Sequence, residues 1–469
     1  MSGVASLDVD RVQHFLDRIV DLCGDGRNEP ARPSVEALAK AWRELGLRPG
    51  DRVILALPNG VRLLEHFFAV LASGGVPALV SPVTPSVRLR ELCGHMNARA
   101  VAARHLDLAA LGLDADFSLG ELRVGITPAR PEPASAAGEV VQLTSGTCGF
   151  PSGCLFDLDA LLRNAGRHAD AIGQRPDDTV LVTLPLHFSY ALVAQALAAL
   201  LRGGTLVIAG PPFTAASYLE MVDTHRVTVS SLTPVGARAL LAQGTPFAPA
   251  LRVLTVGGDA LPAEQVGQLL ARRPDRELYI TYGLTQCGPR VSTLAAHREP
   301  PERYSSVGLP LPGTRTRLEE VDDASGMMEL LVSSDTVMKR RVGLVEGRAQ
   351  HDWASPGVIA TGDLFEQDGD GYLYFRGRRS DFIIRRGEKI SLATVRRIAC
   401  QIPNVVRAKA TVLQRPDGES DYDLTLGVDG AGPVDEAACR AHLRASLLRR
   451  EWPHEVRVIR LDGGLTEFK

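Results

Sequence analysis

The sequence predicts an α/β fold, with a large N-terminal region of βα-layered sheets and a smaller α+β module after it. Apolar runs of strand length alternate with amphipathic runs of helix length over most of the chain. The first set is DRVILALPNG, RLLEHFFAVLASGG and VPALVSP, in the order strand, helix, strand. Strands that are connected by helices are mostly parallel and are covered on both faces, so continuous apolar runs of this kind favour a layered sheet.

Two more sets repeat this order. They are TVLVTLPL, ALVAQALAALLRGG and TLVIAG, followed by VTVSSL, VGARALLAQ and LRVLTVGG. Turns rich in Gly and Asp occupy 357–378, and the segments after them, from DFIIRRGEKI to HEVRVIRL, mix short strands with amphipathic helices. No repeat of solenoid period and no low-complexity tract interrupts the pattern. The C-terminal segments therefore predict the small α+β module.

Composition limits the class of protein. The chain has 469 residues, of which 45% are hydrophobic, which is enough for two or three domains with a substantial core. Its formal net charge of -3 gives no signature of a polyanion-binding surface, so no nucleic-acid partner is expected. Residues 1–20 lack a basic stretch followed by an apolar core, and the longest apolar run, 190–201, is too short to span a bilayer. We expect a cytoplasmic protein with no membrane partner.

The cysteines give no sign of a disulfide framework or a metal site. There are seven, scattered along the chain, with no CxxC and no Cys/His metal spacing. Reduced thiols are therefore expected. Cys148 and Cys154 lie in and just after the glycine-rich loop described next, and Cys287 lies in a second motif, so thiol chemistry is the alternative to a simple packing role.

A run of small hydroxyl and glycine residues, TSGTCGFPSG at 144–153, follows the apolar run EVVQL. Glycines let the backbone turn sharply and approach an anion, and hydroxyl groups add donors beside the main-chain N–H groups. The run therefore predicts a phosphate-binding loop, with an ordinary surface loop as the alternative. The residues expected to bind phosphate are Thr144, Ser145, Gly146, Thr147 and Gly149.

Two later motifs strengthen this prediction. They are LYITYGLTQCG at 278–288 and ATGDLFEQDGDGYLYFRGRRSDFIIRRGEKI at 360–390. With the loop, they resemble the adenylate-forming superfamily of acyl-CoA synthetases, carrier-loading adenylation domains and luciferases, whose motifs run roughly TSGTTGxPKG, YGxTE and TGD followed by GRxxD. Further matches in the same order extend the resemblance over nearly the whole chain, at 184–188, 254–261, 305–313 and 328–339.

The resemblance implies an activity and a domain arrangement. The expected reaction is ATP-dependent activation of a small carboxylic acid as an acyl-adenylate, with release of pyrophosphate and with Mg²⁺ as the metal. The acyl group would then pass to the thiol of CoA or of a phosphopantetheine carrier protein. The alternatives are an amine or other nitrogen acceptor, or a nucleotide-binding relative that has lost efficient adenylation. The implied domains are 1–379 and a mobile C-terminal lid, 380–469.

The resemblance also implies roles for particular residues. Adenine would stack on Tyr282, and Asp363 would accept both ribose hydroxyls, with Arg378 donating to ribose or phosphate oxygens. The positions implied to contact the nucleotide, besides the loop, are Gly257, Gly258, Tyr282, Gly283, Asp363 and Arg378. The positions implied to be catalytic are Lys469, Thr285, Gln286 and His187.

The chain departs from the family pattern at positions that handle charge. Ser152 stands where the loop has a lysine, and Gln286 stands where a glutamate helps to hold the magnesium. A neutral amide still offers an oxygen to a hard cation but attracts it less. Ser380 occupies the hinge position, which is usually Asp or Lys. Lys469 lies one residue closer to its threonine than in the family motif, so a frayed cationic tail is the alternative for it.

The acid and the acceptor are less determined. His187, Phe188 and Tyr190 lie where relatives line the acyl site, with Asp259 at its edge. The chain lacks the aspartate that α-amino-acid-activating domains carry, so an aryl, small acyl or unusual acid is expected. In the lid, the residues near the acceptor would be Ser380, Arg385, Arg386 and Gly387. A single glycine after arginine favours a phosphopantetheine carrier slightly, although either arginine could bind the phosphates of free CoA, or be part of a solvated charge cluster.

Overall fold

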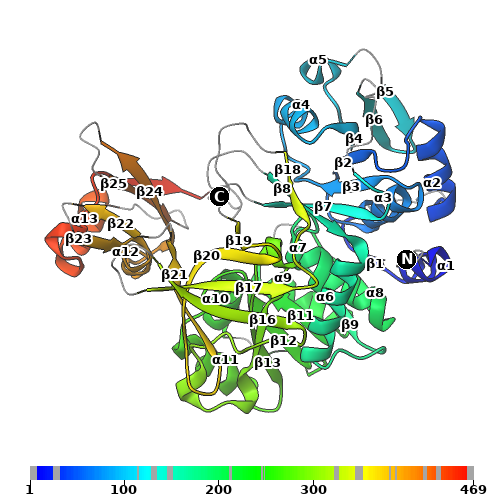
Figure 1. The fold of residues 1–469 in the computed structure, drawn as a ribbon. Coiled ribbons are helices and arrows are strands. Elements are labelled where there is room, and N and C mark those ends of the chain that lie inside the picture. Colours follow the sequence, from blue (N-terminus) through cyan, green and yellow to red (C-terminus); the bar gives the residue numbers. More distant parts are fainter. Residues whose placement is uncertain are drawn as a thin grey trace. The chain divides into compact units, whose positions relative to one another are not determined.

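The chain forms two compact units. The computed structural model describes residues 8–24, 32–113, 116–127, 135–144, 152–210, 214–244, 247, 249–321, 327–343, 352–379, 382–385, 388–415, 420–428 and 435–461. The first unit comprises Met1–Arg317, Leu331–Thr361 and Gln367–Tyr374, and the second comprises Leu318–Leu330, Gly362–Glu366 and Phe375–Lys469. Figure 1 shows their helices and strands, which confirm the predicted α/β class.

An eight-stranded sheet lies in the N-terminal part of the first unit. In spatial order its strands are β18 (Arg340–Val342), β8 (Ser152–Asp157), β7 (Glu139–Thr144), β3 (Val76–Leu79), β2 (Arg52–Ala56), β4 (Ala98–Ala103), β6 (Leu122–Ile126) and β5 (Asp116–Leu119). Strand β2 is parallel to β3 and β4, and all five of its residues are buried. The accompanying helices are α2 (Val35–Glu44), α3 (Val61–Ala72), α4 (Ser86–His95) and α5 (Leu108–Leu111). Burial on both faces explains why β2 and β3 are continuous apolar runs.

A second eight-stranded sheet belongs to the same unit. Its order is β1 (Val20–Asp21), β10 (Thr205–Ile208), β9 (Thr179–Val182), β11 (Val229–Leu232), β12 (Val253–Gly257), β13 (Glu277–Tyr282), β14 (Ser292–Ala295) and β15 (Leu309–Pro310). Its helices are α1 (Val9–Asp17), α6 (Leu158–Ala171), α7 (Ser189–Ala191), α8 (Ala198–Arg202), α9 (Ala215–Thr224), α10 (Pro234–Gln243) and α11 (Ala263–Ala271). Short helical turns η2 (Thr285–Cys287), η3 (Ala296–Arg298) and η4 (Pro301–Arg303) follow β13. From β1 to β13 the strands run parallel.

Local sequence signals set several of the helix starts. The Ser34 side chain accepts a hydrogen bond from the backbone N–H of Ala37 and caps α2. Thr233 caps α10 in the same way, and Pro234 occupies the first helical position, where its missing N–H is harmless. The apolar segment around 190–201, which reads as one helix, instead contains a π-helical stretch, η1 (Leu192–Leu197), between α7 and α8.

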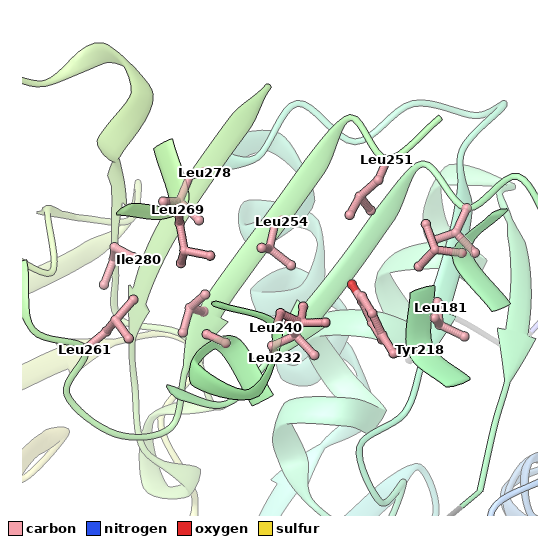
Figure 2. Packing of buried hydrophobic residues seen from close by; sticks show 14 of the residues in the cluster. Leu181, Tyr218, Leu232, Leu240, Leu251, Leu254, Leu261, Leu269, Leu278 and Ile280 are labelled. Carbon is pink, nitrogen blue, oxygen red and sulfur yellow. The ribbon is translucent and has the colours of Figure 1, made fainter. Parts of the chain in front are cut away.

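The core of the second sheet packs helices against the parallel strands. Figure 2 shows Leu232 and Leu254 from β11 and β12 among the side chains of helices α10 and α11, including Leu240 and Leu269. All four are at most 2% exposed. This packing fixes the carboxyl ends of β12 and β13, which is the edge where ligands bind in open α/β sheets.

A third sheet and a small module complete the chain. The sheet order is β16 (Thr314–Glu320), β17 (Met328–Ser334), β20 (Val358–Gln367) and β19 (Trp353–Ser355), with β21 (Leu373–Arg378) paired to β20. The module contains the hairpin β22 (Phe382–Arg385) and β23 (Glu388–Ser391), the sheet β24 (Val405–Gln414), β25 (Ser420–Val428) and β26 (Val456–Arg460), and α12 (Leu392–Ala399), α13 (Glu436–Ser446) and η6 (Arg449–Glu451). Tyr422, Leu424 and Leu426 of β25 form part of its own hydrophobic core.

Two further observations concern the described residues alone. No helix among them is long and apolar enough to cross a membrane. Four of the described cysteines, Cys23, Cys93, Cys154 and Cys439, are free thiols.

Candidate active site

The ends of the predicted phosphate loop lie side by side. Strand β7 ends at Thr144 and β8 begins at Ser152, and these two residues are paired in the antiparallel register. Thr144 Oγ1 lies 3.1 Å from the Ser152 carbonyl oxygen and 3.2 Å from its hydroxyl oxygen. The loop itself, with Ser145, Gly146, Thr147 and Gly149, lies outside the described residues. We refer to the paired residues Thr144 and Ser152 as the loop neck.

An arginine that the sequence analysis missed lies at the loop neck. Arg341 Nη1 donates to Thr144 Oγ1 and to Ser152 Oγ, both at 2.9 Å. The other edge of the guanidinium forms a two-bond pair with Asp352, with Nε and Nη2 donating at 2.7 and 2.8 Å. The Arg341 side chain is only 8% exposed. Burial lowers the pKa of Arg341, but the hydrogen bonds to Asp352 outweigh that effect and raise it above its ordinary value. Arg341 is therefore a permanent cation at the neck.

Gln286 lies beside the same ion pair. Its Nε2 is 3.5 Å from Asp352 Oδ1, and its backbone carbonyl accepts from the N–H of Met338 at 2.8 Å. The neighbouring Thr285 Oγ1 lies 3.1 Å from Ser189 Oγ, at the start of α7. Gln286 is thus linked to the loop neck through Asp352 and Arg341, and Thr285 precedes it in η2.

The described residues suit Mg²⁺ only as a metal held largely by phosphate. Among them, no group of three or more His, Cys, Asp or Glu side chains is arranged to hold a metal. Both oxygens of Asp352 already accept from Arg341. An amide whose nitrogen faces Asp352 turns its oxygen elsewhere, so Gln286 offers one neutral oxygen ligand. Mg²⁺ commonly takes one or two protein oxygens, with the remaining ligands from water and substrate phosphate, so this donor set fits.

The glycines expected near adenine lie at the carboxyl ends of β12 and β13. Gly257 ends β12, and a Cβ atom there would overlap the hydroxyl of Thr281. Gly283 follows β13, and its Cβ would overlap the carbonyl oxygen of Pro289. Gly258 has φ +92°, which side chains rarely adopt. Tyr282, the residue expected to stack on adenine, is 9% exposed.

A second buried arginine, Arg290, lies at the same strand ends. Its Nη1 donates to Thr281 Oγ1 at 2.8 Å, and its guanidinium carbon lies 3.7 Å from the centre of the Tyr190 ring. Nε and Nη2 are buried and have no hydrogen-bond partner among the described residues. Each buried N–H left without a partner costs on the order of 1–3 kcal/mol, whereas a cation–π contact contributes about 0.5–2 kcal/mol. Those two atoms carry three N–H groups, so the contacts shown offset only part of the free-energy cost of burying the guanidinium.

The remaining residues expected at the acyl site lie in the segment before α7. His187 and Phe188 have ring centroids 4.3 Å apart. Asp259 is exposed, and its carboxylate accepts from the N–H of Ala260 at 2.8 Å. The hydroxyl oxygen of Tyr190 lies 3.2 Å from Oγ1 of Thr255, and this hydrogen bond connects the ring to β12.

In the second unit, two predicted nucleotide contacts lie together. Arg378 Nε is 3.1 Å from Asp363 Oδ1. Asp363 is 2% exposed, whereas the Arg378 side chain is more than half exposed. Arg385 donates to Asp421 at 2.7 Å and to the carbonyl of Trp452 at 2.9 Å. Ser380, Arg386, Gly387 and Lys469 lie outside the described residues.

Comparison with known proteins settles the family. A family model for AMP-binding enzymes matches residues 32–340. The chain belongs to this family. It is 30% identical over 450 residues to a feruloyl-CoA synthase from an Amycolatopsis species, which covers 90% of this chain and 87% of the relative. It is 28% identical over 448 residues to sulfoacetate–CoA ligase from Cupriavidus necator, with coverages of 90% and 86%.

A solved structure shows the same fold. The o-succinylbenzoate CoA synthetase from Bacillus subtilis, in complex with its acyl-adenylate intermediate, superposes with a TM-score of 0.72 at 21% identity, covering 91% of this chain and 88% of that one. As a member of this family, the chain is an ATP-dependent acid–thiol ligase that forms an acyl-adenylate from a small carboxylic acid. The activity implied by the motifs is thereby confirmed.

Proposed function

We propose that the loop neck and Arg341 form the part of the ATP site that binds the β- and γ-phosphates. The observation that carries this proposal is the position of Arg341 Nη1, which lies 2.9 Å from the hydroxyl on each side of the loop. Ser152 replaces the lysine of the family, and Arg341 brings a positive charge to the same neck from β18. Asp352 holds the guanidinium in a fixed orientation through two bonds.

The chemistry that this site would serve has two steps. In the first, an oxygen of the substrate carboxylate attacks the α-phosphorus of ATP. The bond between that phosphorus and the oxygen that bridges the α- and β-phosphates breaks, and pyrophosphate leaves. In the second, a thiolate sulfur attacks the acyl carbon, the bond to the AMP oxygen breaks, and AMP leaves. Charge accumulates on the departing pyrophosphate in the first step, so a fixed cation at the loop neck would stabilise that step more than the second.

The other predicted residues keep the roles that the family motifs give them. Gln286 would hold Mg²⁺ through its amide oxygen, and the bound metal would neutralise phosphate charge. Tyr282 would bind adenine, and its burial beside Gly257 and Gly283 supports a fixed platform. Asp363 and Arg378 would bind ribose. His187 and Thr285 would act near the reacting carboxylate.

The lid and the acceptor complete the proposal. Residues 380–469 would act as the mobile domain, with Lys469 serving the first step and the loop at Arg386 and Gly387 serving the second. The acceptor would be free CoA, because both relatives above are named as CoA enzymes; a carrier protein is the second candidate, favoured by the single glycine in this loop. Free thiols among the described residues support a cytoplasmic location.

Acid-dependent exchange of radiolabelled pyrophosphate into ATP tests the first step. We expect exchange with at least one acid of a panel of aryl, small acyl and dicarboxylic acids, and formation of the acyl-CoA on addition of CoA. Exchange without acyl-CoA, but with an acylated carrier or amide, would replace CoA by that acceptor. No exchange with any acid, in a protein that still binds ATP by calorimetry, would contradict the proposed function.

A further inference from the structure

Arg290 is a buried cation to which the proposed ATP chemistry assigns no role. It is 3% exposed, and its Nη1 is bonded to Thr281 Oγ1. No carboxylate of the described residues forms an ion pair with it, and neither Nε nor Nη2 has a hydrogen-bond partner there. Buried arginines are normally paired with an anion. The charge of Arg290 is therefore not compensated by an anion among the described residues.

The location of these donors points to a ligand. A Cβ atom on Gly257 would lie 3.2 Å from Arg290 Nη1, so the guanidinium lies against the end of β12. Tyr190, from the segment expected to line the acyl site, stacks on it at 3.7 Å. A stacked ring covers the face of a guanidinium and leaves the in-plane N–H groups at its edge able to donate. The guanidinium of Arg290 thus lies against one residue of the segment expected to line the acyl site and beside the end of β12.

The positive charge of Arg290 also acts on a neighbouring group. His168 of α6 is fully buried, and both of its ring nitrogens lack a partner among the described residues. Burial lowers the pKa of His168 well below its ordinary value, and the charge of Arg290 lowers it further. A neutral imidazole does not compensate the positive charge of a guanidinium, whereas an anion supplied by the substrate would compensate it.

Another buried arginine provides a contrast. Arg273 is also 3% exposed and lies 5.0 Å from the Phe247 ring centre, with Nε and Nη1 buried and without a partner among the described residues. However, its Nη2 donates to the carbonyl of Leu251 at 3.0 Å, just before the amino end of β12. That edge of a parallel sheet is opposite to the one where ligands bind. Arg273 is therefore the matched control for a buried arginine with no substrate to bind.

We propose that the acid activated by this enzyme carries a second anionic group, a carboxylate or a sulfonate, that Arg290 binds through its Nε–H and Nη2–H edge. This inference rests on the proposed function, because it identifies the class of acid that the same site activates. The reacting carboxylate attacks ATP, while the second anion stays ionised and takes no part in bond making. A planar guanidinium binds such an oxyanion with two parallel hydrogen bonds, which also fixes the direction of the substrate.

Pairs of acids that differ only in the second anion test the proposal. Each dicarboxylic acid is compared with its monoamide, and each sulfo acid with its sulfonamide, by kcat/KM for acid-dependent pyrophosphate exchange. A site that offers buried donors strongly rejects an analogue that cannot satisfy them. We expect the wild-type enzyme to prefer the dianion of at least one pair by about 100-fold or more, and Arg290→Gln to lose most of that preference.

The controls separate specificity from folding. Arg273→Gln should keep the wild-type preference, and Arg290→Gln should keep the wild-type Kd for ATP, measured by calorimetry without acid. Arg290→Lys retains a charge and should keep an intermediate preference, which a purely structural role would not produce. If Arg290→Gln does not fold, Arg290→Lys takes its place, and an undiminished preference for the dianion in that variant contradicts the inference.

The outcomes are distinguishable. If monoamides and neutral acids support exchange as well as the dianions, the inference is wrong and the proposed function stands. If the dianion is preferred but Arg290→Gln keeps the preference, another cation binds the second anion and the inference is also wrong. If no acid of either kind supports exchange, the proposed function fails and the inference fails with it.

Discussion

Two buried arginines of the first unit, Arg341 and Arg290, differ in what satisfies them. Arg341 is bound by a carboxylate through two bonds and by two hydroxyl oxygens, so its Nε, Nη1 and Nη2 all donate within the described residues. Arg290 has one hydroxyl acceptor and an aromatic ring. A paired charge is built into the protein and shapes the loop neck. An unpaired buried charge is destabilising in the absence of an anion, which is why we propose that the substrate supplies one at Arg290.

The largest expected effect is on stability, and it should have opposite signs at the two positions. Arg341→Met would leave the largely buried Asp352 without the donors that compensate its charge, and should destabilise the protein by about 3 kcal/mol. Arg290→Met removes a buried charge that no anion compensates, and should stabilise the acid-free protein by about 1 kcal/mol. Urea unfolding of both variants at neutral pH measures the two changes.

A double variant shows whether the ion pair between Arg341 and Asp352 causes the loss of stability. In the double variant Arg341→Met, Asp352→Ala, no carboxylate is stranded, so the loss should be much smaller than that of Arg341→Met alone. Equal losses in the single and double variants would mean that Arg341 stabilises the neck through Thr144 and Ser152 only. A destabilised Arg290→Met would mean that its contacts with Tyr190 and Thr281 already satisfy the guanidinium.

The second prediction concerns nucleotide affinity at Arg341. Arg341→Gln combined with Asp352→Asn removes both charges and keeps hydrogen-bonding side chains of similar shape. Loss of a charged donor to phosphate is worth on the order of 1.5–3 kcal/mol, so ATP should bind roughly 10- to 100-fold more weakly while AMP is nearly unaffected. Adding Ser152→Lys to that variant returns a cation to the neck and should recover most of the ATP affinity.

Calorimetry with ATP and AMP, without acid, distinguishes a charge effect from a structural one. Equal weakening of ATP and AMP, with no recovery from Ser152→Lys, would show that Arg341 only braces the ends of the loop. Arg290→Gln serves as the comparison, because it should change neither nucleotide affinity.

The fold could be predicted from the sequence to a greater extent than the contacts of these two arginines. Strands such as β2 and β12 are mostly apolar because helices cover both faces of the sheet, and this pattern can be recognised in the sequence. The resemblance to the family likewise implied that Gln286 acts on the phosphates that the loop would hold. Arg341, in contrast, reaches Thr144 across 197 positions of sequence because β18 pairs with β8. A two-residue basic run, Arg340 and Arg341, gives no signal for such a pairing.

Arg290 escaped sequence reasoning for a different reason. It follows Gly288 and Pro289, a dipeptide typical of turns, where a basic residue is usually exposed. Its burial arises from tertiary packing against Tyr190 and from the bond between its backbone N–H and Asn164 at 2.9 Å. The sequence did indicate an aryl, small acyl or unusual acid rather than an α-amino acid, but burial without an ion-pair partner is a property of the folded state.

The smallest expected effect is a change in acid sensitivity, which tests whether the charge of Arg290 acts on His168. His168 is buried with its pKa lowered by burial and by Arg290, and His66 is buried with its pKa lowered to about 4 by burial and by Arg62. Both histidines stay neutral in the folded state but take up a proton when unfolded, with a pKa near 6.5. The unfolded state therefore binds more protons below pH 6.5, so each histidine should lower the free energy of unfolding as pH falls from 6.5, by about 1 kcal/mol each at pH 5.5.

Arg290→Met removes one cause of the lowered pKa of His168. The free energy of unfolding of this variant should therefore fall less between pH 6.5 and 5 than that of the wild type, by a few tenths of a kcal/mol. Arg273→Met, which leaves both histidine environments unchanged, should keep the wild-type slope. A wild-type slope in Arg290→Met as well would show that burial alone keeps His168 neutral over this pH range.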